Sequence, residues 1–215
     1  MSRTRNPGVE TLRSDPAYRL VRELGFQDMI PFVLTHIKEK GIMSMIYLGA
    51  NLSMLGIIIV CIVMGILDQS ITWRGIIGQS LIGIFCGSIL VIPPHELLHG
   101  AAYRILGAKS IRFGADFQQF IFFVTADRYP VSGRQLYFLA LVPFVVINLV
   151  TIALTLLFFQ QAILFSGFFL LSHNIMCIGD FAIANFVYRA KGRLYSFDEP
   201  EEKKSYFFEE VTGEG

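Results

Sequence analysis

Four stretches of the chain are long and apolar enough to cross a lipid bilayer, and they constrain the fold more than any other feature. A membrane-spanning helix needs about 20 mostly apolar residues. The four stretches cover residues 42–67, 75–106, 135–159 and 162–188. Only two glutamines separate the last two stretches, which predicts a tight helical hairpin. The expected fold is therefore an all-α membrane protein with four transmembrane helices.

The positions of lysine and arginine predict how these spans are oriented. Of the 18 basic residues, seven precede the first span, one follows it, five lie at the end of the second span or between the second and third spans, and five follow the fourth. Basic residues of membrane proteins gather on the cytoplasmic side. We therefore expect an integral, multi-pass membrane protein with both termini in the cytoplasm.

Three segments lie outside the predicted spans. Residues 1–41 contain helix-forming patches around 18–24 and 32–40, and we expect a cytoplasmic segment with helices along the membrane surface. Residues 109–129 are expected to form a β-hairpin on the cytoplasmic side, because SIRFGADF alternates in polarity and FIFFVT is rich in strand formers. Residues 189–215, which include the charged run DEPEEKK, are expected to be a solvated cytoplasmic tail.

Charge and cysteine content exclude other classes of protein. The net charge is +1, which gives no basic surface of the kind that binds nucleic acid. The lipid bilayer is the expected partner instead. The three cysteines all lie within apolar stretches, so they are interpreted as small buried residues rather than as a disulfide framework.

The motif HELLH lies inside the second apolar stretch. Ionisable residues are costly in a membrane span and are usually functional. On a helix, His95 and His99 face the same side one turn apart, and both imidazoles can bind one zinc ion. Glu96 is then placed beside the metal, where it can act as the base for an attacking water. Pro93 and Pro94 predict a kink or a new helix start just before the motif.

A catalytic zinc ion usually has three protein ligands, so a third ligand is expected. The ionisable candidates in the other spans are His173, Cys177 and Asp180, which share one face of the fourth predicted helix. Counted from the cytoplasmic ends of the spans, Asp180 matches the depth of the motif best, while Cys177 and His173 lie deeper. Asp180 is therefore the favoured ligand, and the other two remain alternatives. The structural alternative is a cluster of polar side chains that holds no metal.

Two asparagines within the predicted spans admit two roles. Asn148 lies in the third span and Asn174 in the fourth. Either side chain can bind a substrate or an oxyanion, or it can form hydrogen bonds between helices. Bonding between the helices is the favoured interpretation.

The motif and its surroundings resemble two groups of proteins. HELLH in one span and Asp180 in a later span resemble the intramembrane zinc metalloproteases of the site-2 protease class. A closer resemblance covers residues 43–188 and rests on the four spans, the prolines before the motif, the aromatic hairpin and the Gly179 and Asp180 pair. This second resemblance is to small bacterial membrane proteins described as zincin peptidases.

This resemblance implies a location in the bacterial cell membrane and a zinc site. By position, His95, His99 and Asp180 become the zinc ligands and Glu96 the general acid and base. The chain also departs from the site-2 protease pattern. That pattern has asparagine and proline shortly before the aspartate and glycine after it, whereas here glycine comes before Asp180 and no proline is near.

The leading hypothesis is a zinc-dependent intramembrane metallopeptidase. Its substrate would be a membrane-embedded or juxtamembrane segment of a protein or peptide, held at the edge of the hairpin as an added strand. One alternative is a non-peptidase membrane protein whose metal site serves structure, sensing or transport. Another is a scaffold in which the polar residues only hold the helices together.

Overall fold

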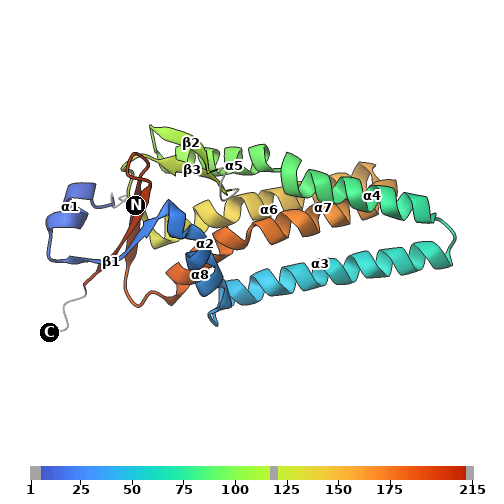
Figure 1. Ribbon diagram of the computed structural model, residues 1–215, viewed down its shortest axis with the longest axis horizontal. Helices are drawn as coiled ribbons and strands as arrows, with labels where there is room; N and C mark the ends of the chain where they lie inside the picture. Colours follow the sequence, from blue (N-terminus) through green and yellow to red (C-terminus); the bar gives the residue numbers. More distant parts are fainter. Residues whose placement is uncertain (1–5, 117–120, 212–215) are drawn as a thin grey trace.

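The structure is a computed structural model that describes residues 6–116 and 121–211. Its helices are α1 (Val9–Ser14), α2 (Met29–Lys38), α3 (Ile42–Leu67), α4 (Trp73–Phe85), α5 (Ile92–Leu106), α6 (Gly133–Phe158), α7 (Ile163–Met176) and α8 (Ile178–Arg189). Its strands are β1 (Tyr18–Gly25), β2 (Ile111–Asp116), β3 (Ile121–Ala126), β4 (Val131–Ser132), β5 (Leu194–Glu199) and β6 (Lys204–Glu210). Figure 1 shows an elongated bundle of helices with the strands gathered toward one end.

Three helical segments are long and apolar enough to cross a membrane. They are α3, the segment Trp73–Leu90 that begins with α4, and α6, and a fourth span is present if the bent pair of α7 and α8 counts as one. The predicted first span coincides with α3, and the predicted third span with most of α6. Large apolar side chains cover the outside of α3, as at Leu52 and Val60, whose exposed fractions are 58% and 60%. Such a surface is typical of a helix that contacts lipid.

The second and fourth predicted spans are not single helices. A π-helical turn, Cys86–Leu90, follows α4, and a new helix, α5, begins at Ile92. Pro93 and Pro94 lie in the first turn of α5, where a missing amide breaks no helical hydrogen bond, so the predicted helix start is confirmed. The chain also breaks at Cys177, where α7 and α8 meet at a bend of 48°. No proline lies near this second break, so the sequence did not predict it.

The prediction of a solvated tail is wrong. The predicted all-α fold with one β-hairpin is confirmed only in part, because the protein is mostly helical but contains a second sheet. Strands β5 and β6 lie within residues 189–215 and form the centre of a four-stranded sheet of order β1-β6-β5-β4, with antiparallel neighbours. The charged run DEPEEKK spans the ends of these strands and the turn between them, which is why it reads as solvated. Strand β1 replaces the helix expected around 18–24, whereas the helix expected around 32–40 is present as α2.

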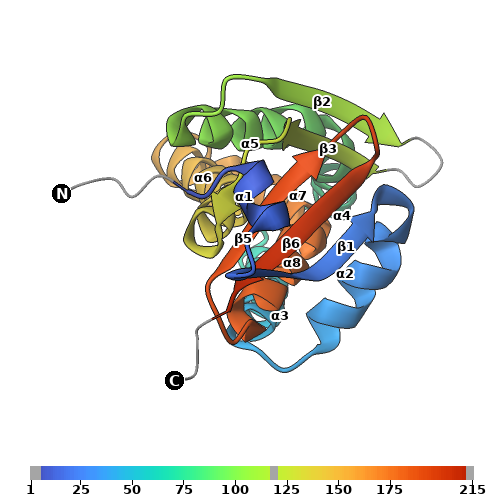
Figure 2. The same ribbon diagram turned by 90° about the vertical axis from the view of Figure 1, so that its left-hand side faces the viewer.

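The sheet is a layer between α1 and the helix bundle. On its outer face, Val9 and Leu12 of α1 pack against three aromatic residues, Phe197, Tyr206 and Phe208. On its inner face, Leu24, Leu194 and Phe207 join a buried cluster with residues of α2, α5, α6 and α8. Figure 2 shows the sheet lying across the end of the bundle. The sheet therefore closes the space between these helices.

Strands β2 and β3 form the two-stranded sheet expected between the second and third spans. They pair antiparallel from Ile111 opposite Ala126 to Asp116 opposite Ile121. Residues 117–120, which connect them, lie outside the described part of the chain. The pair lies beside α5 (Figure 2), so it forms a second wall near the HELLH motif.

Candidate metal site

Helices α5 and α8 bring together the residues predicted to bind zinc. The Nε2 atoms of His95 and His99 are 3.1 Å apart. The carboxylate of Asp180, in the first turn of α8, lies 3.3 Å from the Nε2 of His95 and 3.4 Å from that of His99. Two consecutive turns of one helix and the start of another therefore place three ligand atoms around a common point.

These distances fit the donor set of a zinc ion. With bonds of about 2.0 to 2.1 Å, two ligands of a tetrahedral zinc ion lie about 3.3 Å apart. The side chains of His95, His99 and Asp180 are 13%, 15% and 16% exposed, and all three line one cavity. The ligand atoms are therefore shielded from bulk solvent and still accessible from one side.

A second group of potential ligands shares His95. It consists of His95, His173 and Cys177, and it is the other set found among the described residues. His173 and Cys177 are completely buried, and neither lines the cavity that reaches His99 and Asp180. A catalytic ion needs a position open to substrate, so the geometry favours the group with Asp180.

Neighbouring groups fix the orientation of both imidazoles. The Nδ1 of His99 lies 2.9 Å from the carbonyl oxygen of Leu139. A carbonyl only accepts hydrogen bonds, so Nδ1 carries the proton and Nε2 keeps its lone pair for a metal. The Nδ1 of His95 lies 3.1 Å from the Nε2 of His173, and donation from His95 leaves its Nε2 equally free. Sequence reasoning weighed His173 only as a ligand and missed this contact.

Glu96 lies beside the ligand atoms with one oxygen unused. Its side chain lines the same cavity, and its Oε2 is buried without a hydrogen-bond partner among the described residues. A buried carboxylate oxygen without a partner is costly, and a functional site is where such an atom is expected. The position suits a group that takes a proton from water.

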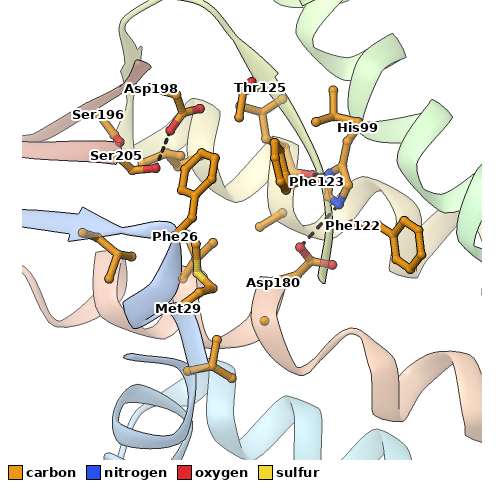
Figure 3. Close-up of a pocket in the computed structure, with 18 of the residues that line it drawn as sticks. Phe26, Met29, His99, Phe122, Phe123, Thr125, Asp180, Ser196, Asp198 and Ser205 are labelled. Carbon is orange, nitrogen blue, oxygen red and sulfur yellow. Dashed lines mark hydrogen bonds and ion pairs between the residues drawn. The ribbon is translucent and has the colours of Figure 1, made fainter. Parts of the chain in front are cut away.

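The cavity has a volume of about 480 Å³ and lies between the helices and the sheet. Figure 3 shows His99 and Asp180 on one side of it and Asp198 and Ser205 on the other, with Phe26 among the side chains between them. The wall from β5 and β6 was missed in the sequence because that segment was interpreted as a solvated tail.

Asp198 on this wall is a carboxyl group with an unusual environment. Burial raises its pKa to about 6, although hydrogen bonds from Ser205 and Tyr103 oppose the shift. The Oγ of Ser205 donates to Oδ1 over 2.6 Å, and the hydroxyl of Tyr103 donates to Oδ2 over 3.4 Å.

The two asparagines join α6 to α7. The Nδ2 of Asn148 donates to the Oδ1 of Asn174 over 2.7 Å, and the Nδ2 of Asn174 donates back over 3.3 Å. The favoured prediction of bonding between helices is confirmed.

Comparison with known proteins gives one result for this chain. A family model described as "Putative zincin peptidase" matches residues 88–195, a range that contains the HELLH motif and Asp180. Searches of curated proteins and of solved structures give no significant match.

Proposed function

Because the chain belongs to the zincin peptidase family that matches residues 88–195, we propose that it is a zinc-dependent intramembrane metallopeptidase. One observation carries the proposal. The Nε2 atoms of His95 and His99 and the carboxylate of Asp180 converge within 3.1 to 3.4 Å of one another. The unpartnered Oε2 of Glu96 belongs to the same cavity.

Each residue of the site has a distinct role in this proposal. His95, His99 and Asp180 hold the zinc ion, while the Leu139 carbonyl orients the ring of His99. When bound, zinc supplies a Lewis acid that activates water and polarises a peptide carbonyl. Glu96 accepts the proton of the attacking water at its carboxylate and delivers it to the leaving amine.

The proposed substrate is a membrane-embedded or juxtamembrane segment of a protein or peptide. The distribution of basic residues supports a topology with both termini in the cytoplasm, in which the sheet and the cavity face the cytoplasmic side of the membrane. Peptide bonds within a helix are shielded, so the segment unwinds before cleavage. Val124 and Thr125 of β3 line the cavity, and the edge of this strand opposite β2 is a place for an extended peptide to add as a strand.

The alternative is a membrane protein that uses its metal for structure, sensing or transport. The buried group of His95, His173 and Cys177 favours this alternative, because such a site is closed to substrate.

Replacement of Glu96 by Gln tests the proposal. The protein, purified in detergent, is assayed for zinc by mass spectrometry and for cleavage of a library of single-span peptides in proteoliposomes. We expect wild type and Glu96→Gln to contain one zinc ion per chain and the variant to lose cleavage by about a thousandfold or more. Glu201→Gln, which removes an exposed carboxylate outside the cavity, should keep both properties. Zinc-loaded wild type that cleaves no peptide would favour the alternative function, and absence of zinc would favour a scaffold.

A further inference from the structure

The wall of the cavity formed by the sheet carries a polar cluster that the proposed chemistry does not use. Asp198 of β5 and Ser205 of β6 are directly opposite each other in the strand register, and both line the cavity. Ser196, two residues before Asp198, lines it as well. Alternation along the strands explains this arrangement, because Phe197 between them packs on the outer face against α1.

In the part of the chain that the structure describes, the carboxylate of Asp198 is bonded to hydroxyl groups and not to a cation. Nearby guanidinium groups are paired with other acids: Arg13 and Arg128 with Glu199, and Arg112 with Asp127 and Glu201. Within residues 6–116 and 121–211, Asp198 forms no ion pair, and its polar partners are hydroxyl groups. A carboxylate that loses solvent without gaining a counter-ion is destabilising, and the loss of solvent raises the pKa of Asp198 to about 6.

Thr125 adds an independent unsatisfied group to the same cavity. Its side chain comes from β3 and is only 5% exposed. In the described part of the chain, its Oγ1 has no hydrogen-bond partner. Figure 3 shows Thr125 along the wall that runs from Asp198 toward His99. A buried hydroxyl without a partner costs free energy unless a ligand bonds to it.

The cluster offers one negative charge and hydroxyl acceptors, which are complementary to a cation with several N–H donors. The rings of Phe26 and Phe123, with centroids 4.7 Å apart, also line the cavity and can contact the aliphatic stem of a long side chain. Cytoplasmic flanks of membrane segments are rich in lysine and arginine. A juxtamembrane substrate would therefore present such a cation.

We propose that Asp198 and Thr125 form a subsite for a lysine or arginine side chain of the substrate, across the cavity from the candidate metal ligands. This inference rests on the proposed function, because it names the class of substrate for the same cavity. The ammonium or guanidinium group donates to the Asp198 carboxylate and to the Thr125 hydroxyl. This group supplies the positive charge that neutralises the Asp198 carboxylate.

Peptide binding tests the subsite separately from catalysis. Zinc-loaded Glu96→Gln protein in detergent is titrated with labelled single-span peptides that carry Lys, Arg or Gln at each juxtamembrane position in turn, and binding is followed by fluorescence anisotropy. At the best position we expect Lys or Arg to bind at least about tenfold more tightly than Gln. Adding Asp198→Asn or Thr125→Val should reduce this ratio, to below about threefold for Asp198→Asn. Adding Glu201→Gln should leave it unchanged.

The combined results separate the subsite from the peptidase. A ratio that depends on Asp198, with no peptide cleaved by wild type, supports the subsite and contradicts the proposed function. Cleavage that needs Glu96 supports the proposed function. If the ratio of kcat/KM for the Lys peptide to that for the Gln peptide is then the same in wild type and in Asp198→Asn, the subsite is overturned. Thr125→Val keeps the test valid if Asp198→Asn fails to fold, and an unchanged ratio in a folded Thr125→Val protein also counts against the subsite.

Discussion

The Nδ1 of His95 lies 3.1 Å from the Nε2 of His173, so a residue of α7 holds the first histidine of the HELLH motif. The rings meet edge to face, with centroids 5.3 Å apart. His173 is completely buried, which leaves it little freedom to turn away. The orientation of a candidate zinc ligand on α5 is therefore linked to the packing of α7 against the bundle.

His173→Ala is expected to weaken zinc binding without abolishing it. Loss of a group that orients a metal-binding histidine typically lowers metal affinity by about 10 to 100 times. Affinity is measured by competition with a chelator of known strength, with His36→Ala, a change outside the residues that line the cavity, as the control. If His173→Ala loses zinc as completely as His95→Ala does, His173 is a ligand and not an orienting residue.

Replacement of Asp180 and of Cys177 distinguishes the two groups of potential ligands. We expect Asp180→Ala to lower zinc affinity by at least about a hundredfold, because it removes one of the three proposed protein ligands. Cys177→Ala should bind zinc like wild type, because this thiol belongs to the second group alone. Zinc content and chelator competition measure both variants. Retention of zinc by Asp180→Ala together with its loss in Cys177→Ala would assign the ion to the buried group.

Asp198 should make the folded protein more stable at pH 5 than at pH 7. Burial raises the pKa of its carboxyl to about 6 in the folded state, against about 3.9 in an unfolded chain. Between these two values the folded protein keeps a proton that the unfolded chain has released. The free energy of unfolding therefore falls by at most about 3 kcal/mol as the pH rises from the unfolded-state pKa to the folded-state pKa. The decrease is complete above the folded-state pKa.

The Tm measured in detergent from pH 5 to 7.5 checks this dependence. Other groups titrate in the same range, so the useful quantity is the difference between wild type and Asp198→Asn. We expect the variant to lose part of the decrease in Tm with rising pH and to be the more stable protein at pH 7. Glu201→Gln should follow wild type. The prediction is wrong if Asp198→Asn and wild type show the same pH dependence.

Phe207→Ala should detach the sheet from the helices. Phe207 is 3% exposed, and its ring packs against Phe32 and Phe186 with centroids 6.4 Å and 5.2 Å away. Truncating a buried phenylalanine costs about 3 to 5 kcal/mol. Limited proteolysis should then cleave the segment containing β5 and β6 sooner than in wild type. Phe159→Ala, at a position 58% exposed beyond the end of α6, is the control and should change little.

The helices were predictable because their signal is local. Residues 42–67 form α3 as expected, since a long apolar run is sufficient to identify such a helix. The strands β2 and β3 were also predictable, because they lie close together in the sequence, the first alternates in polarity and the second is rich in strand-forming residues. The pairing of β1 with β6 joins the two ends of the chain, and no local pattern reveals a partner at that distance.

The candidate site shows the same division. The spacing of His95 and His99 and the depth of Asp180 were enough to predict that the three side chains meet, although their role as zinc ligands stays a prediction. Two features of the site could be found only from the three-dimensional structure. The contact of His173 with His95 depends on how α7 packs, and the place of Asp198 on the cavity wall depends on a sheet that the charged DEPEEKK run concealed.

The order of the strands in the sheet has a consequence for biosynthesis. Strand β1 is translated before every predicted span, and its partner β6 after all of them. The wall that carries Asp198 and Ser205 is therefore absent while the membrane helices insert, and the cavity is completed only when the last strands leave the ribosome. A protein assembled in this order has no finished cavity while its own nascent chain is still unfolded beside it.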